Sequence, residues 1–145
     1  TKINCIIILK TLNIGEKMLK NKKLSILGDS ISTYSGISNN EKSNNTIIDN
    51  PCFYDKRYPL EMMYWIRLLN VFDMQLCVNN SWSGGNLSGI NDKTSGVNRA
   101  SELSSSNGEL PDLIIIFMGL NDLGRSVDPN VFKADYEKTL ENIKK

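Results

Sequence analysis

Residues 24–30 read Leu-Ser-Ile-Leu-Gly-Asp-Ser, a short apolar run that ends at Gly28 and is followed by two polar side chains. Such a run is typical of a buried strand that gives way to a loop or a helix. Two later stretches repeat the plan: residues 74–80 read Met-Gln-Leu-Cys-Val-Asn-Asn, and residues 113–119 read Leu-Ile-Ile-Ile-Phe-Met-Gly. The unbroken apolar character of residues 113–118 predicts a strand that is buried on both faces, as strands of parallel sheets are.

Helical patterns separate and follow these strands. Pro59 can begin a helix, and we expect this helix to be mostly buried because it has a broad apolar face. That face holds Leu60, Met63, Tyr64, Trp65, Ile66, Leu68, Val71 and Phe72. A weaker helix is predicted within residues 93–106, where apolar residues recur every three positions at Val97, Ala100 and Leu103. Asp128 can cap a third helix with Pro129 at its first position, and the apolar stripe of that helix is Phe132, Tyr136, Leu140 and Ile143.

The alternation of strand and helix predicts an α/β fold, with a parallel sheet and helices on its faces. The pattern stops after the third strand and its helix, so we expect a domain that is truncated at its C-terminus. An apolar strand left at the sheet edge favours self-association. Residues 18–145 are predicted to be this incomplete domain, with Met18 as an initiator and residues 1–17 as an extension outside the core; the alternative is an ordinary first strand at residues 3–9. Residues 31–58 form a long polar stretch without periodicity, which is either functional or disordered.

The composition limits the classes of partner and chemistry. The 145 residues hold 17 Lys plus Arg and 16 Asp plus Glu, a balance that offers no electrostatic reason to expect nucleic acid or an anionic membrane. The sequence holds no His, which excludes His-ligated metal sites and an imidazole base from within these residues. Cys5, Cys52 and Cys77 suggest neither a disulfide framework nor a zinc ribbon. No apolar run approaches the ~20 residues of a spanning helix and no signal peptide is visible, so we expect a cytoplasmic location.

Polar clusters follow all three predicted strands, at residues 28–30, 80–85 and 119–122. The carboxyl ends of parallel strands converge on one crevice, so we expect the three clusters to face one site. Ser30, directly after a strand, fits a nucleophile. The backbone N–H groups of Gly84 and Ser30 and the side-chain amide of Asn121 could then form an oxyanion hole. Taken singly, each cluster is more often a turn, a loop or a helix cap, and it is their combination in this order that favours a site.

These blocks resemble those of the SGNH hydrolases, also called the GDSL family of esterases and lipases. Residues 28–30 resemble the nucleophile block of that family, residues 79–84 its glycine block, and residues 119–122 its Gly-x-Asn-Asp block, within a similarity that covers roughly residues 23–143. The resemblance implies a flavodoxin-like three-layer α/β/α fold with strand order 2-1-3-4-5. It also implies a serine esterase without cofactor or metal, in which Ser30 is the nucleophile and Gly84 and Asn121 donate to the oxyanion. The substrate would be a small-molecule acyl ester, and the fuller motif strings resemble a bacterial branch described as acyl- or carbohydrate-ester hydrolases.

The sequence departs from this family at its fourth block, an Asp-x-x-His that carries the general base and has no counterpart here. Without a base, the Ser30 hydroxyl is a poor nucleophile at neutral pH, so we expect the chain as given to be inactive. The alternative hypothesis is a flavodoxin-like module that binds a small anion or a sugar at the same strand ends and performs no chemistry. Trp82 could stack on a sugar ring or lie in the core. Asp29 and Asp122 are interpreted as loop and cap residues in preference to metal ligands.

Overall fold

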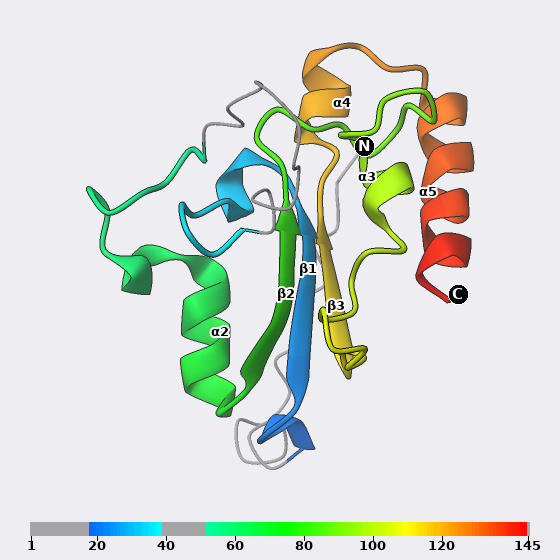
Figure 1. Ribbon diagram of the computed structural model, residues 1–145. Helices are drawn as coiled ribbons and strands as arrows, with labels where there is room; N and C mark the ends of the chain where they lie inside the picture. The colour runs from blue at the N-terminus through cyan, green and yellow to red at the C-terminus, as the bar shows by residue number, and fades with distance from the viewer. Residues whose placement is uncertain (1–17, 39–51, 145) are drawn as a thin grey trace.

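The computed structural model describes residues 18–38 and 52–144. Three strands alternate with helices in the predicted order (Figure 1). The elements are β1 (Lys23–Gly28), the 3-10 helices η1 (Ser30–Ser32) and η3 (Leu60–Met62), α2 (Tyr64–Phe72), β2 (Gln75–Ser81), α3 (Gly96–Arg99), β3 (Leu113–Phe117), α4 (Leu120–Gly124) and α5 (Pro129–Ile143). The predicted N-terminal extension at residues 1–17, the alternative strand at 3–9 and residues 39–51 of the polar stretch lie outside the described residues. No helix among the described residues is long and apolar enough to cross a membrane.

The three strands form one parallel sheet in the order β2-β1-β3. Gly28 at the end of β1 is paired with Ser81 of β2 and with Phe117 of β3, so the carboxyl ends of all three strands lie at one edge, uppermost in Figure 1. The connection from β1 to β2 and the connection from β2 back across β1 to β3 run in opposite directions. Right-handed crossovers therefore place α2 on one face of the sheet and α3 on the other, and α5 packs on the same face as α3. This arrangement confirms the predicted α/β fold and the first three positions of its strand order.

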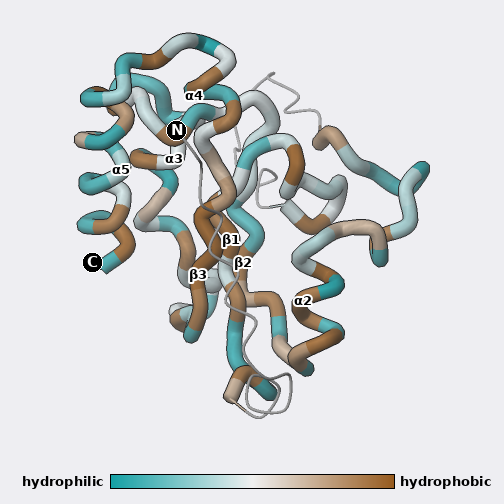
Figure 2. Tube along the Cα trace, turned by 180° about the vertical axis from the view of Figure 1, so that it is seen from behind, coloured by the Kyte–Doolittle hydropathy of each residue, from teal (hydrophilic) through white to brown (hydrophobic). Residues whose placement is uncertain are grey.

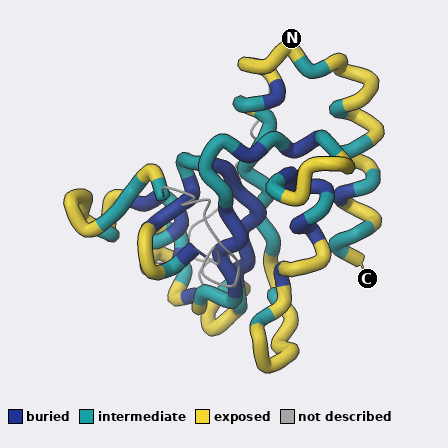
Figure 3. Tube along the Cα trace, turned by 45° about the horizontal axis from the view of Figure 1, so that its top comes forward, coloured by how far each residue is buried: buried dark blue, intermediate teal, exposed yellow. Residues whose placement is uncertain are grey.

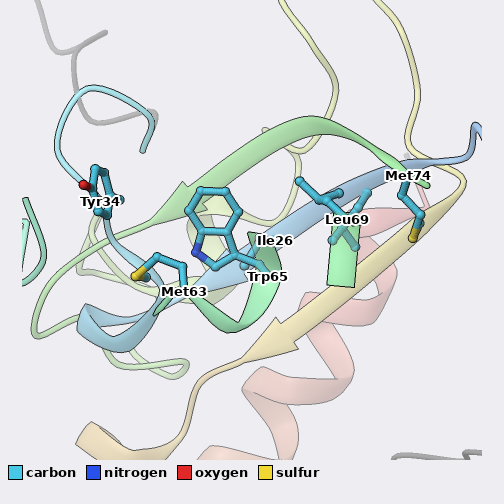
Figure 4. Packing of buried hydrophobic residues seen from close by; sticks show 7 residues of the cluster. Ile26, Tyr34, Met63, Trp65, Leu69 and Met74 are labelled. Carbon is cyan, nitrogen blue, oxygen red and sulfur yellow. The ribbon is translucent and has the colours of Figure 1, made fainter. Parts of the chain in front are cut away.

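The face of the sheet that α2 covers holds the larger apolar cluster (Figure 4). Trp65 of α2 is completely buried and packs in the same cluster as Leu24 and Ile26 of β1. The indole N–H of Trp65 donates to the Ser32 carbonyl at 3.2 Å, so the polar atom of this buried ring is paired, as buried indoles require. Helix α2 is thereby tied both to the sheet and to η1, the turn that follows β1.

The opposite face of β1 packs against α3, the chain after it, and α5. Leu27 forms a buried cluster with Ala100 and Leu103, to which Ile143 of α5 adds a partly buried side chain. The Ser25 hydroxyl, also on this face, donates to the Leu103 carbonyl at 2.7 Å. Figure 2 shows the apolar segments of β1 and β3 side by side, and Figure 3 shows buried chain at the centre with exposed chain along α5. Helices on both faces make the fold a three-layer α/β/α arrangement.

Two helices differ from their predicted extents. The α-helix begins at Tyr64 and not at Pro59, because Met63 has extended dihedral angles (φ −65°, ψ 128°) that separate it from the 3-10 turn η3. Its predicted apolar face is only partly covered, and Val71 is 52% exposed. The helix expected within residues 93–106 shortens to α3, although Val97, Ala100 and Leu103 are buried as apolar spacing suggested.

Strand β3 is less buried than its composition predicts. Its side chains are half-buried or exposed, and Leu113 is 37% exposed, whereas Leu24, Ile26 and Leu27 of β1 are 0% exposed. The reason is position, since β3 is an outer strand of the described sheet and only β1 pairs with it. The prediction of burial on both faces is therefore wrong for β3, whereas β1, which pairs with a strand on each side, is buried on both faces.

Candidate active site

Ser30 is the first residue of η1, two residues beyond the end of β1. Asp29 caps this turn, and its side chain accepts from the Ile31 amide at 3.0 Å. Gly28 is required by close packing, because a Cβ at this position would lie 2.5 Å from both Ser32 Cβ and Ser81 Oγ. The Gly-Asp-Ser string is thus a strand end, a cap and the start of a half-buried turn in succession, and it holds the Ser30 backbone in a defined position.

Asp29 itself is 2% exposed. Burial raises the pKa of its carboxyl group, while the Ile31 amide and the nearby Arg99 charge act in the opposite direction. The carboxylate is used as a cap and lies below the surface of the turn. Among the described residues no group of three or more Cys, Asp or Glu side chains is placed to hold a metal ion.

Gly84 follows β2 in a loop that stays close to the end of β1. The Trp82 amide donates to the Gly28 carbonyl at 3.1 Å, and the Gly85 amide donates to the Trp82 carbonyl at 3.1 Å. Gly84 has φ +73°, a left-handed conformation that glycine adopts without strain. Trp82 is half-buried at this turn. The second cluster of the sequence therefore lies beside the first, at the carboxyl edge of the sheet.

Asn121 and Asp122 lie in the first turn of α4, and both contact the loop that follows β2. The Asn121 side-chain amide donates to the Gly85 carbonyl at 2.9 Å. The Asp122 carboxylate is 2% exposed and accepts from the Leu87 amide at 2.7 Å, from the Ser88 amide at 2.9 Å and, through a short contact, from the Ser88 hydroxyl. Sequence reasoning interpreted Asp122 as a cap residue, but Gly119 holds the cap position. Asp122 instead fixes the loop against the helix.

The backbone amides of Ser30 and Gly84 make no hydrogen bond to any part of the chain within 18–38 and 52–144. The Asn121 side-chain nitrogen carries two N–H groups, of which the Gly85 carbonyl uses one. All three residues follow strand ends that are paired in register at Gly28. Backbone and side-chain donors arranged in this way can bind an oxyanion beside a serine hydroxyl. The catalytic roles of Ser30, Gly84 and Asn121 stay predictions.

Arg99 of α3 bonds the carboxyl ends of β1 and β2, and the sequence analysis did not identify it as a residue of the site. The side chain is 3% exposed. Its guanidinium donates to the backbone carbonyls of Asn80 (2.5 Å), Gly28 (3.1 Å) and Thr94 (2.8 Å), and it contacts Met118 Sδ at 3.6 Å. Burial lowers the pKa of Arg99 to about 10, so the group stays charged at neutral pH. The signal in the sequence is that Arg99 is a charged residue in a segment whose apolar positions, Val97, Ala100 and Leu103, predict burial.

The fold defines a parallel α/β/α protein whose candidate site lies at the carboxyl ends of its strands, as in open α/β sheets generally. The family model for GDSL-like lipase/acylhydrolase matches residues 22–143, and the chain belongs to this family. A crystal structure described as a GDSL-like lipase from Bacteroides ovatus ATCC 8483 is similar with a TM-score of 0.64 at 21% identity, covering 86% of this chain and 67% of that one. A second, from Bacteroides uniformis ATCC 8492, has a TM-score of 0.63 at 24% identity, covering 93% of this chain and 68% of that one. Among curated proteins, none matches the chain.

Proposed function

We propose that the chain supplies the nucleophile and the oxyanion-binding groups of an acyl-ester hydrolase. The Ser30 hydroxyl attacks the ester carbonyl, the ester C–O bond breaks and the alcohol leaves with the proton, and water then hydrolyses the acyl-Ser30 ester to release the carboxylic acid and restore Ser30. The amides of Ser30 and Gly84 and the side chain of Asn121 bind the oxyanion. The observation that carries this proposal is the placement of the three residues after strand ends that pair at Gly28, with two of the amides making no hydrogen bond within the described chain.

The reaction needs a general base for the Ser30 hydroxyl, and these 145 residues contain no His. A serine without a base is a weak nucleophile. An oxyanion hole and binding alone leave triad enzymes roughly 10³-fold above the uncatalysed rate. We therefore expect the chain alone to be nearly inactive toward short activated esters, and its activity to depend on a base supplied from outside these residues. No cofactor or metal takes part in the proposed reaction.

The proposed substrate is a small acyl group on a carbohydrate or a similar ring-bearing alcohol. Its support is an exposed aromatic residue whose backbone is linked to that of Ser30: Phe53 is 60% exposed, and its ring centroid lies 5.0 Å from that of Tyr54. The Phe53 amide donates to Thr33 Oγ1 at 2.9 Å, and the same hydroxyl donates to the Ser30 carbonyl at 2.8 Å. One buried hydroxyl thus joins the backbone of Phe53 to that of Ser30. Exposed aromatic rings offer an apolar face on which a sugar ring can stack.

Chemical rescue with free imidazole tests this proposal. The chain is incubated with p-nitrophenyl acetate, with and without imidazole, while nitrophenol release and acetylation of the peptide that contains Ser30 are followed by mass spectrometry. We expect an imidazole-dependent adduct on Ser30 that the Ser30→Ala variant lacks. Ser35→Ala, which removes an exposed serine from the same loop, is the matched control and should behave like the parent. Asn121→Ala should slow acylation by about 10²–10³-fold, the usual cost of one oxyanion donor.

A second candidate function is a non-catalytic module that binds a small anion or a sugar at the same strand ends. The absence of His from these residues is the observation that favours it. Under this alternative, imidazole-dependent nitrophenol release is equal in the parent and in Ser30→Ala, and Ser30 stays unmodified. That result would overturn the hydrolase proposal.

A further inference from the structure

Helix α4 presents a second side chain to the loop that follows β2. Arg125 lies four residues after Asn121, and its amide donates to the Asn121 carbonyl at 2.9 Å, so both residues occupy the same helical face. Asn121 bonds the Gly85 carbonyl, and Arg125 Nη1 donates to Asn86 Oδ1 at 2.8 Å. Gly85 and Asn86, which are successive residues of the loop, are therefore bonded by Asn121 of α4 and by Arg125, the residue that follows this helix.

The second nitrogen of the same guanidinium lies next to Gly84. Arg125 Nη2 is 3.8 Å from the point where a Cβ on Gly84 would stand, and no other heavy atom of residues 18–38 and 52–144, apart from the residues adjacent to Gly84, lies within 4 Å of that point. Arg125 is exposed to solvent, and Nη1 of its guanidinium is bonded to Asn86. A guanidinium group thus lies beside the backbone of Gly84, the residue whose amide the proposed function assigns to the oxyanion hole.

We propose that Arg125 is a specificity-determining residue that binds a negatively charged group on the substrate close to its scissile carbonyl. The inference rests on the proposed function, because Gly84 locates the carbonyl. Guanidinium groups recognise carboxylates and phosphates through several N–H donors. The preferred esters then carry an anion a few bonds from the carbonyl, on either the acyl or the alcohol part.

The positive charge of Arg125 also acts on a carboxylate of the protein, that of Asp92. The pKa of Asp92 is lowered mainly by the Thr94 hydroxyl (2.7 Å) and the Thr94 amide (2.8 Å), and the Arg125 charge adds to the effect. An incoming anion would meet the attraction of Arg125 and the repulsion of Asp92. Removal of the Asp92 charge is therefore expected to strengthen anion binding, which provides a test of opposite sign to the loss of Arg125.

The test uses anilides as stable analogues of aryl esters. Their Kd for the whole chain is measured by calorimetry. The acyl-side pair is N-phenylsuccinamic acid and butyranilide, which differ by a carboxyl group in place of a methyl group. The alcohol-side pair is 4-acetamidobenzoate and N-(4-methylphenyl)acetamide. We expect one anionic member to bind about three- to tenfold more tightly than its neutral partner, which corresponds to about 0.7–1.4 kcal/mol. The pair that shows the preference identifies the part of the substrate that carries the charge.

The variants distinguish a local effect of Arg125 on anion binding from an effect of the net charge of the protein. Arg125→Gln should abolish the anion preference and leave neutral anilides unaffected, Arg125→Lys should retain part of it, and Asp92→Asn should increase it. Lys20→Gln removes the same charge near the opposite end of β1, from a side chain that is 62% exposed and pairs with Asp73, and it should keep the preference. The preference should also weaken at high salt, because the site is exposed.

The inference is overturned if neither anionic compound binds more tightly than its neutral partner. It is also overturned if Arg125→Gln binds the preferred anionic compound as tightly as the parent does. Failure of the proposed function gives a different signature. In that case the Ser30 adduct is missing in the imidazole experiment while the Arg125-dependent preference persists, which describes an anion-binding module. An adduct on Ser30 without any anion preference would reject the role of Arg125 alone.

Discussion

Arg99→Ala should destabilise the protein strongly, because the side chain joins the ends of two strands and the chain before α3. Three backbone carbonyls, those of Gly28, Asn80 and Thr94, accept from one buried guanidinium. Leaving a buried acceptor unsatisfied costs about 1–3 kcal/mol, and water that enters the vacated space recovers part of this. With three buried acceptors affected, we expect a loss of about 3–5 kcal/mol. Domains have net stabilities of about 5–15 kcal/mol, so much of the fold's stability depends on this residue.

Urea unfolding followed by far-UV circular dichroism measures the change. Arg99→Lys keeps the charge but has no planar fork, and it should lose less than Arg99→Ala while remaining below the parent. Arg67→Ala is the matched control: Arg67 is exposed on α2 and its side chain donates to the Glu61 carbonyl at 3.0 Å, so its loss should cost less than about 1 kcal/mol. If Arg99→Ala unfolds within about 1 kcal/mol of the parent, the claim that Arg99 supports the site is wrong.

Asp122→Asn should lower stability by about 2–3 kcal/mol in urea unfolding, because an NH₂ group would face the Leu87 or Ser88 amide; an unchanged midpoint would contradict this. Self-association through β3 predicts that size-exclusion chromatography shows oligomers, and that Leu113→Lys, which adds a charge to this outer strand, shifts them toward monomer; a parent that is already monomeric would reject it. Asp112 accepts from the first amide of β1, which lowers its pKa below the ordinary 3.8. The Asp112 carboxyl group therefore binds a proton more readily in the unfolded chain, and the free energy of unfolding falls as the pH drops below about 4. Asp112→Asn should make this fall less steep when unfolding is measured at several pH values; an equally steep fall would refute the assignment.

Local sequence patterns were sufficient to predict the strands and the last helix. Residues 24–28 lie in β1 and residues 113–117 form β3, because apolar runs of this length, bounded by turn residues, are too short for typical helices and fit buried strands. Helix α5 begins as predicted, with Asp128 accepting from the Asn130 amide at 2.7 Å and Pro129 at the first position. These signals act over a few residues, so the sequence carries them without tertiary information.

The same reasoning was wrong where distant contacts decide the outcome. The helix predicted from Pro59 begins at Tyr64, after an extended Met63 that lies buried in the cluster on the α2 face. The apolar sequence of β3 predicted burial on both faces, but coverage depends on how many strands pair with it. Apolar composition reports how much surface can be buried and does not report which neighbours are present.

For the candidate site, the sequence by itself determined the identities of Ser30, Gly84 and Asn121 and their positions after predicted strands, because motif spacing is a property of the chain. Only the tertiary structure decided what surrounds them. The pairing of Gly28 with Ser81 and Phe117 sets the three strand ends at one edge. The buried guanidinium of Arg99 and the placement of Arg125 beside Gly84 join segments far apart in the chain. Such contacts leave no periodic trace in the sequence, since each depends on crossover handedness, strand order and loop path together.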